Sequence, residues 1–403
     1  MARAELRRIT GPWRLADLKN VPSNGLTGFS CFHCGGGSTM GYKLAGFQML
    51  GGVEIDPEMM GIYRANHKPK HSYLMGVQQF NELPLDELPD ELKQLDLLDG
   101  SPPCSVFSMA GKRDKKWGSE HHFREGQKKQ RLDDLFMHFI EVGHRLQPKV
   151  IVAENVKGLI LGNAKGYVKE IFAAFREAGY ETQLFLFNAA RMGVPQARER
   201  TFFVARRRDL GWVPLRMKFE EPVVSVQKAW EDLSKQSARE LTAETKALWM
   251  QLKPGQSLKE VHPKGSRFNE FRLPWTSPSM TLTALCSINL YHPLEPRKLS
   301  AAEIIRLQSF PDDYDFCGVD PGYVMGMSVP PFITQRVALE ISRQWFGINY
   351  ECPAPRPSTS PGLASTPRSG PSSPRSAASS PRSGPSSPRS AASSPRSTCW
   401  QRK

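Results

Sequence analysis

The sequence predicts an α/β protein built on a doubly wound open sheet. Between residues 25 and 206, short runs rich in strand-forming residues alternate with segments of helical spacing. Many of these runs are apolar on both faces, as buried strands of a parallel sheet are. The chain has 403 residues and 39% hydrophobic content, enough for one large domain and a smaller one, each with its own core.

The expected strands and helices follow one another along this region. The strands are six runs, at residues 25–32, 48–55, 95–100, 149–155, 182–188 and 200–207. Helical spacing marks two segments between them, Pro57 to His67 and Leu132 to Leu146. In the second helix, the apolar side chains that share one face are Leu132, Leu135, Phe136, Phe139 and Ile140.

The alternation stops near residue 209, where tryptophans and mixed polar helical sequence begin. A helix is expected from Arg297 to Gln308, with Ser300 and Glu303 forming a capping box. A last helix begins near Pro330 and Pro331, because proline is tolerated in a first helical turn. The predicted organisation is an N-terminal extension at 1–24, a first domain at 25–208, a smaller module at 209–296, and helices at 297–350 that return to the first domain.

After Pro353 the composition changes to Pro, Ser, Arg, Ala and Gly, and the 14 residues at 367–380 are repeated at 381–394. Such sequence has nothing to bury, so we expect residues 351–403 to form a disordered tail. From Cys352 onward the tail holds seven Arg, one Lys and no acid, which supplies 8 of the 14 net positive charges. Weak nonspecific affinity for nucleic acid is one interpretation of this tail, and a passive extension is the favoured one.

The seven cysteines form no regular framework, which fits a reducing compartment. The chain has neither a signal-like apolar run nor 18 uninterrupted apolar residues, so we expect a soluble, cytoplasmic protein. The stretch CFHCGGG at 31–37 is either half of a zinc or redox site or a glycine-rich turn. No second Cys or His pair stands at ligand spacing, and His121 and His122 have no matching cluster, so we expect the turn and no metal.

Cys104 is the first candidate catalytic residue. It follows an apolar strand in the stretch DGSPPCSVFS at 99–108, and doubly wound sheets place ligands at the carboxyl ends of their strands. Pro102 and Pro103 stiffen the backbone before it. A buried structural thiol is the ordinary role of a cysteine, but this setting favours a nucleophile.

Three further residues are candidates at the same edge. Glu154 ends the next apolar strand and could share a site with Cys104, although a capping acid would look the same alone. Arg198 and Arg200 alternate with other residues before the strand at 200–207, so with Gln196 they would line one face. Paired arginines suit an anion or carbonyl group, and solvated edge arginines are the alternative.

Seven segments, in order, resemble the DNA (cytosine-5)-methyltransferases of prokaryotic or phage type, which use S-adenosylmethionine and include restriction–modification enzymes. The segments span most of residues 25–347. They are FHCGGGSTMG at 32–41, VEID at 53–56, GSPPCSVFS at 100–108, ENV at 154–156, QARER at 196–200, RKLSAAEIIRLQSFP at 297–311 and GMSVPP at 326–331.

The resemblance implies a Rossmann-like methyltransferase sheet, with the catalytic and cofactor-binding domain at 25–208 and a target-recognition domain at 209–296. Cys104 would add to carbon 6 of a flipped-out cytosine while Glu154 protonates or hydrogen-bonds ring nitrogen 3. Arg200 would steady the cytosine carbonyl, and Arg198 would order the site. The partner implied is duplex DNA, bound by a monomer, and the basic loop at 111–131 would close on its phosphates.

The resemblance also implies a binding site for S-adenosylmethionine. The glycines would let the backbone approach the methionine part of the cofactor, and Glu54, at the end of the following strand, would accept hydrogen bonds from the ribose hydroxyls. The residues expected to bind the cofactor are Phe32, Cys34, Gly35, Gly36, Gly37, Glu54, Ile55, Pro102, Met327, Ser328 and Val329.

Three positions depart from the family pattern. Cys34 replaces a glycine, Gly76 falls where an Asp toward the adenine is common, and Met327 replaces an Asn. Loss of the acid would remove a hydrogen bond worth roughly 0.5–1.5 kcal/mol net, so we expect altered cofactor contacts and retained activity. Two alternatives remain at this point: the same chemistry on tRNA, and a catalytically silent DNA-binding relative.

Overall fold

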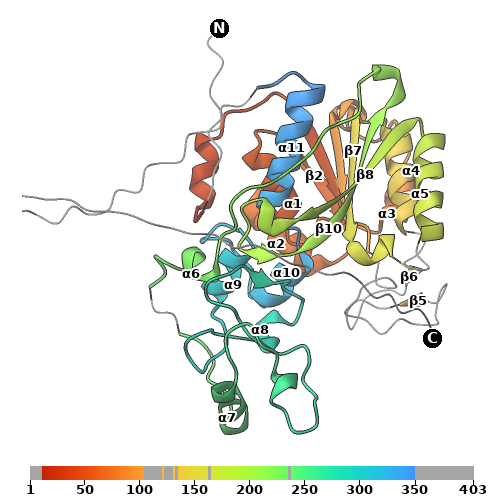
Figure 1. The fold of residues 1–403 in the computed structure, drawn as a ribbon. Coiled ribbons are helices and arrows are strands. Elements are labelled where there is room, and N and C mark those ends of the chain that lie inside the picture. The colour runs from red at the N-terminus through yellow and green to blue at the C-terminus, as the bar shows by residue number, and fades with distance from the viewer. Residues whose placement is uncertain are drawn as a thin grey trace, which may run out of the picture. The chain divides into compact units, whose positions relative to one another are not determined.

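Seven strands form a central sheet in the order β3-β2-β1-β4-β7-β10-β8 (Figure 1). The computed structural model describes residues 11–103, 120–121, 130–131, 135–161, 165–234 and 237–349. The strands of this sheet are β1 (Thr27–Cys31), β2 (Gln48–Glu54), β3 (His71–Leu74), β4 (Leu97–Gly100), β7 (Val150–Val156), β8 (Tyr180–Asn188) and β10 (Glu199–Arg207). The doubly wound α/β class predicted from the sequence is confirmed.

Strand direction is uniform except at β10. The neighbours from β3 to β7 pair in parallel, whereas β10 runs antiparallel to both β7 and β8. All six predicted strands are present. The sequence interpretation missed β3, a four-residue strand without a buried position, and it did not foresee the reversed direction of β10.

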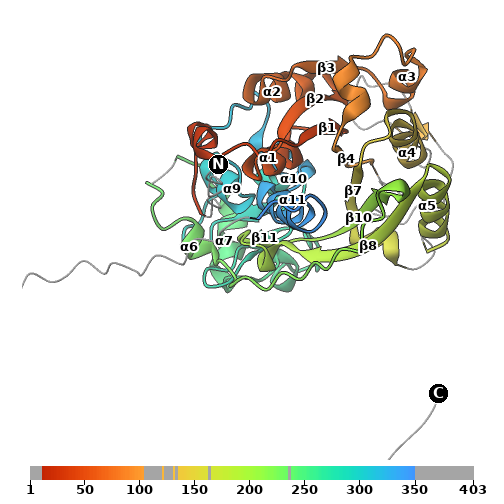
Figure 2. The same ribbon diagram turned by 90° about the horizontal axis from the view of Figure 1, so that it is seen from above.

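Two hydrophobic cores lie on the two faces of the sheet, because successive side chains of a strand point to opposite sides. In β7, Val150 and Val152 belong to one core, and Ile151 and Ala153 to the other. Helices α1 (Gly37–Leu44) and α11 (Pro331–Trp345) cover the first face (Figure 2). The second face is covered by α3 (Val77–Glu82), α4 (Leu135–Leu146) and α5 (Lys165–Glu177).

The helix boundaries agree with the cap signals in the sequence. Helix α2 spans Pro57–His67, and Asp56 caps it by accepting from two backbone N–H groups. Helix α9 spans Ala301–Leu307, so it begins four residues after the expected start at Arg297. It starts after Ser300, whose hydroxyl and the Glu303 carboxylate form the predicted capping box. Helix α10 (Pro321–Met327) starts after Asp320, whose side chain accepts from two backbone N–H groups as that of Asp56 does. Helix α11 begins at Pro331, as expected.

From residue 226 to 291 the chain forms short elements, drawn below the sheet in Figure 1. They are α6 (Val226–Ala229), α7 (Ala243–Gln251), β11 (Phe271–Arg272), β12 (Ser279–Met280), α8 (Cys286–Asn289) and β13 (Leu290–Tyr291). This region has a small apolar cluster of its own, around Trp249 and Leu258. It also joins the first domain, because β12 pairs with β9 (Gln196–Ala197).

Several predictions fall wholly or largely on residues outside this description. Cys104 and the tail at 351–403 are among them, and the chain divides at Pro353, so Ala354–Lys403 is a separate unit. Of the basic loop, only β5 (Glu120–His121) and β6 (Gln130–Arg131) are described, paired antiparallel. Among the described residues, no helix is both long and apolar enough to cross a membrane.

Candidate active site and cofactor turn

Glu154 and Arg200 form a buried ion pair at the carboxyl edge of the sheet. Arg200 Nε lies 2.9 Å from Glu154 Oε1, and both side chains are about nine-tenths buried. The β7–β10 register explains the contact, since Arg200 stands opposite Val156, which shares a face with Glu154. Burial lowers the pKa of Arg200, and the nearby carboxylate of Glu154 opposes that effect. The structure therefore brings together two of the predicted catalytic residues.

Arg198 and Gln196 lie beside this pair but contact other groups. Arg198, 2% exposed, donates to the carbonyls of Leu282 at 2.9 Å and Gly326 at 3.2 Å. Gln196 accepts from the Leu282 N–H at 3.0 Å and donates to Gln308. Both side chains thus hold the main chain of Leu282, and Arg198 ties the second module to the end of α10.

The chain that leads to Cys104 is anchored at two points, although Cys104 itself lies outside the described residues. The Ser101 N–H donates to the Cys31 carbonyl at 3.4 Å. The Asn155 Nδ2 donates to the Pro102 carbonyl at 3.1 Å. Asn155 immediately follows Glu154, so one side chain fixes the distance between the ends of β4 and β7. The sequence interpretation quoted Asn155 in its ENV match and gave it no role.

Asp99 is a buried hub that the sequence interpretation also missed. Its carboxylate accepts from the hydroxyls of Ser30 at 2.7 Å, Ser38 at 2.6 Å and Tyr42 at 3.1 Å. Burial raises the pKa of Asp99 to about 6, and the three hydroxyl donors oppose that rise. The network joins β1, α1 and β4 directly beneath the edge. The signal in the sequence that could have revealed Asp99 is an acidic residue near the end of a buried apolar strand.

The turn at residues 32–36, called the cofactor turn below, is held by Glu54. The Glu54 carboxylate accepts from the N–H of Cys34 at 3.0 Å, of Ile55 at 2.9 Å and of Asp56 at 3.0 Å. It is buried, and desolvation raises its pKa. Both predicted elements of the cofactor site, the turn and the acid after β2, therefore meet at one place.

The glycines of this turn avoid collisions with the chain itself. A Cβ on Gly35 would lie 2.4 Å from Val324, and one on Gly37 would lie 2.2 Å from the Val329 carbonyl. A Cβ on Gly36 would lie 2.2 Å from His67 Nε2. The sequence interpretation assigned these glycines to close approach of a ligand, whereas the structure shows close packing against α2 and the segment around α10.

The remaining predicted cofactor residues surround the same turn. Ser328 and Val329 are buried against Gly35 and Gly37, and the Ser328 hydroxyl has no hydrogen-bond partner among the described residues other than the Cys34 thiol beside it. Met327 is 42% exposed. The Ile55 side chain lies 3.7 Å from the position of a Cβ on Gly76, so Gly76 is a neighbour of one predicted cofactor residue.

Cys31 and Cys34, the two cysteines of the CFHCGGG stretch, are not bonded to each other. Both are free thiols, and they point to opposite faces of the sheet, Cys31 into one core and Cys34 toward the other. Cys34 Sγ contacts Met59 Sδ at 3.5 Å. Within the described part of the chain, no group of three or more His, Cys, Asp or Glu side chains could hold a metal ion.

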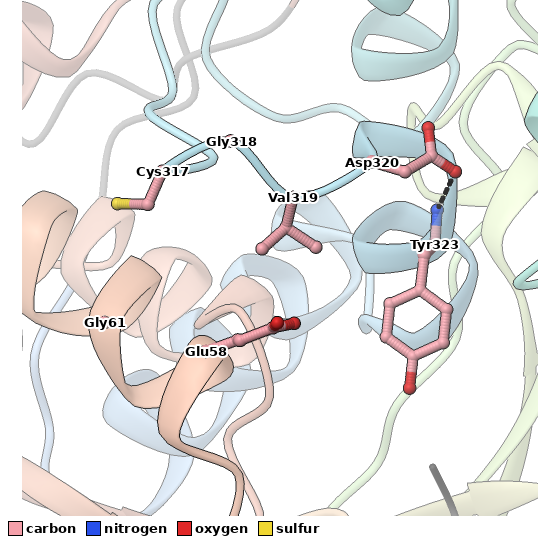
Figure 3. Close-up of a pocket in the computed structure, with 7 residues that line it drawn as sticks. All are labelled: Glu58, Gly61, Cys317, Gly318, Val319, Asp320 and Tyr323. Carbon is pink, nitrogen blue, oxygen red and sulfur yellow. Dashed lines mark hydrogen bonds between the residues drawn. The ribbon is translucent and has the colours of Figure 1, made fainter. Parts of the chain in front are cut away.

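A cavity of about 530 Å³ opens between α2 and the segment that leads into α10 (Figure 3). The same two helices pack behind Gly35, through Ile62 and Val324. Glu58 and Asp320 give the cavity a negative lining, and Asp320 is held by the N–H groups that it caps. The lining residues, none of them predicted, are Glu58, Gly61, Cys317, Gly318, Val319, Asp320 and Tyr323.

Solved structures of known proteins share this fold. A prophage-encoded Escherichia coli protein described as a DNA modification methyltransferase matches with a TM-score of 0.59 at 22% identity, covering 79% of this chain and 99% of that one. Spodoptera frugiperda DNMT2 matches with a TM-score of 0.57 at 17% identity and the same coverage of both chains. At these identities the likeness concerns the fold alone.

Sequence relatives are more specific. The chain is 30% identical over 333 residues to the Type II methyltransferase M1.HphI of Haemophilus parahaemolyticus, covering 78% of this chain and 86% of that protein. It is 31% identical over 325 residues to M.Sau96I of Staphylococcus aureus, covering 75% and 72%. The family model described as C-5 cytosine-specific DNA methylase matches residues 26–343, which include every described element of the site. The chain therefore belongs to the C-5 cytosine-specific DNA methylase family, whose members are S-adenosylmethionine-dependent methyltransferases.

Proposed function

We propose that this chain methylates carbon 5 of a cytosine flipped out of duplex DNA, with Cys104 as the covalent nucleophile and S-adenosylmethionine as the methyl donor. The observation that carries the proposal is the buried ion pair of Glu154 and Arg200. It stands at the edge where β4 ends, and Asn155 ties that end to β7 only two residues before Cys104.

The residues of this chain divide the chemistry among them. The Cys104 thiolate adds to carbon 6, and Glu154 holds a proton at ring nitrogen 3, so that carbon 5 becomes nucleophilic. Arg200 keeps Glu154 in place and faces the carbonyl of the base. Once carbon 5 carries the transferred methyl group, a base removes its proton, the bond between carbon 6 and Cys104 breaks, and the thiolate leaves. A stacked base cannot reach a buried carboxylate, which is why flipping is required.

The residues around the cofactor turn fit S-adenosylmethionine, which supplies an electrophilic methyl group when bound. The Ser328 hydroxyl is buried beside the Cys34 thiol and has no other hydrogen-bond partner among the described residues, so it is a polar group that a ligand or water could contact. Glu54 is fixed at the end of β2, where doubly wound folds bind ribose hydroxyls. Phe32 and Ile55 would lie against the adenine part, with Pro102 and Met327 at the border.

Residues 209–296 are proposed to read the target sequence. The region has its own apolar cluster, and it presents large exposed side chains such as Met250 and Phe268, 66% and 62% exposed. The Arg272 guanidinium lies 3.8 Å from the centre of the Trp249 ring, which fixes the direction of both side chains.

Covalent trapping tests the proposal. With S-adenosylmethionine present, a DNA duplex carrying 5-fluorocytosine at target sites should form a denaturation-resistant adduct with the full-length chain, because fluorine blocks the final proton removal. Cys104→Ser should abolish the adduct, and the matched control Cys317→Ser, which alters an exposed free thiol, should not. Absence of an adduct in the unaltered chain would favour a silent DNA-binding relative. Methyl transfer to tRNA instead of duplex DNA would favour the RNA alternative.

A further inference from the structure

The cofactor turn holds a conformation that two of its residues would not adopt alone. Phe32, Cys34 and Gly36 have φ angles of 53°, 49° and 89°. The left-handed region is open to glycine but costs energy for a residue with a side chain. Such residues persist only where surrounding groups fix them. Some part of the protein must therefore hold Phe32 and Cys34 in place.

Two carbonyl groups of the turn accept hydrogen bonds from buried side chains. His33 Nδ1 lies 2.9 Å from the Cys34 carbonyl oxygen, and the Tyr314 hydroxyl donates to the Gly35 carbonyl. A carbonyl only accepts, so we assign the His33 proton to Nδ1. On its other side, the Cys34 N–H donates to Glu54. Both main-chain polar groups of Cys34 are therefore held by side chains.

His33 belongs to a stack of aromatic rings, called the aromatic ladder here, made of His33, Tyr63 and His67. The His33 and Tyr63 rings lie 3.7 Å apart at 20°, and the Tyr63 and His67 rings 4.5 Å apart at 18°. His67 Nε2 is 3.0 Å from the Tyr314 hydroxyl oxygen. The Tyr314 hydroxyl donates its proton to the Gly35 carbonyl, so in the contact between His67 and Tyr314 the donor is His67. The ladder and Tyr314 thus form one connected support.

Each imidazole of the ladder carries a second ring nitrogen that a phenyl ring would lack. His33 Nε2 and His67 Nδ1 are buried without a hydrogen-bond partner among the described residues. An unsatisfied buried acceptor is destabilising. A phenylalanine would stack on Tyr63 without that penalty. What imidazole adds at each position is one N–H donor. The His33 donor bonds directly to a carbonyl of the cofactor turn. The His67 donor bonds to the Tyr314 hydroxyl, which in turn donates to another carbonyl of the turn.

We propose that His33 and Tyr314 are positioning residues for the methyl donor, because they fix the cofactor turn in its left-handed form before the cofactor arrives. The inference rests on the proposed function, since it takes the cofactor to bind over this turn. It predicts that removing either donor weakens cofactor binding and leaves DNA binding unchanged.

The test measures the dissociation constant for S-adenosylmethionine by titration calorimetry on full-length variants. His33→Phe and Tyr314→Phe keep the ring and remove the donor, and each should weaken binding about fivefold, the usual effect of losing one hydrogen bond. The matched control is Tyr180→Phe, whose buried hydroxyl donates to the Pro148 carbonyl at 2.7 Å on another part of the sheet. It should lower the unfolding temperature similarly without changing cofactor affinity.

A second substitution separates positioning from packing. Glycine adopts a φ of 49° without penalty, so Cys34→Gly added to His33→Phe should restore most of the lost affinity. A loss that Cys34→Gly does not restore would mean that His33 acts through packing, and it would overturn the inference. Equal affinities in the unaltered chain, His33→Phe and Tyr314→Phe would also overturn it. If the unaltered chain binds no cofactor, the proposed function fails instead.

Discussion

At the scale of single residues, the ion pair of Glu154 and Arg200 decides most about the chemistry. The two groups are buried together, so removing one leaves the other without compensation. A general acid or base contributes typically 10² to 10⁴ in rate. In the proposed mechanism, Glu154 therefore serves both catalysis and local stability.

Glu154→Gln should lower kcat for methyl transfer by roughly 100-fold or more. The amide keeps the shape of the side chain but neither holds a proton at ring nitrogen 3 nor balances Arg200. The measurement is transfer of a labelled methyl group to duplex DNA. Glu181→Gln is the control, because Glu181 pairs with Arg206 at the far end of β10. Equal rates for Glu154→Gln and the unaltered chain would contradict the assigned role.

Gly76→Asp should strengthen cofactor binding. Gly76 has a φ of −70° and caps α3, a position where aspartate is favoured, and its Cβ would meet no atom closer than 3.2 Å. The new carboxylate would border Ile55 at the proposed adenine side. Calorimetry should show a gain of about fivefold in affinity for S-adenosylmethionine, worth about 1 kcal/mol. Gly76→Ala fills the same space without the acid and should show no gain.

The buried histidines predict how stability depends on pH. Burial lowers the pKa of His33 from 6.5 to about 4, and it also holds the pKa of His67 well below 6.5. Both are neutral in the folded chain and gain a proton on unfolding below pH 6.5, so the free energy of unfolding falls as the pH drops from 6.5 toward 4. Asp99 acts in the opposite sense between about 4 and 6, because its pKa is raised to about 6.

The two histidines therefore oppose Asp99 and Glu54, whose pKa burial also raises, in the pH dependence of the free energy of unfolding. Urea unfolding at pH 5 and pH 7 measures it. His33→Phe should make the dependence shallower and Asp99→Asn should make it steeper. The opposite order of these two slopes would rule out this explanation.

At the scale of elements, the apolar runs predicted six of the seven strands, because buried strands need apolar residues on both faces. The direction of β10 could not be predicted, since Phe202 to Ala205 would be equally buried in either direction. The caps of α2 and α9 were visible locally, as Asp56 and Ser300. The hydrogen bond by which Tyr314 supports the cofactor turn could not be predicted from the sequence. Tyr314 and Gly35 are 279 residues apart, and their contact depends on tertiary packing.

Asn155→Ala tests the link between β4 and β7. Without the hydrogen bond to Pro102, the chain before Cys104 loses its anchor beside Glu154. A small displacement of a catalytic group can lower a rate on the order of 100-fold, so kcat should fall while the KM for cofactor changes little. Asn81→Ala removes a similar side-chain bond, to the His138 carbonyl at 3.0 Å between α3 and α4. That control should lose stability without losing kcat; equal kcat values in both variants would speak against the anchor.

At the scale of the whole molecule, every described part of the site lies at one edge of the sheet, where parallel strands end and β10 begins. The sequence predicted this edge because Glu154 and Arg200 flank neighbouring apolar runs. It did not predict that Asp99 and the aromatic ladder would brace the edge from below, since buried polar side chains reveal their partners only in three dimensions.

The packing of Gly35, Gly37 and Gly41 against residues 324–335 has a consequence for how the protein is made. The cofactor turn leaves the ribosome early, but the segment that covers its back is synthesised almost 300 residues later. A nascent chain can form β1, β2 and α2 without yet presenting a finished cofactor site. If the cofactor binds at this turn as proposed, it should stabilise the completed chain and bind incomplete precursors only weakly.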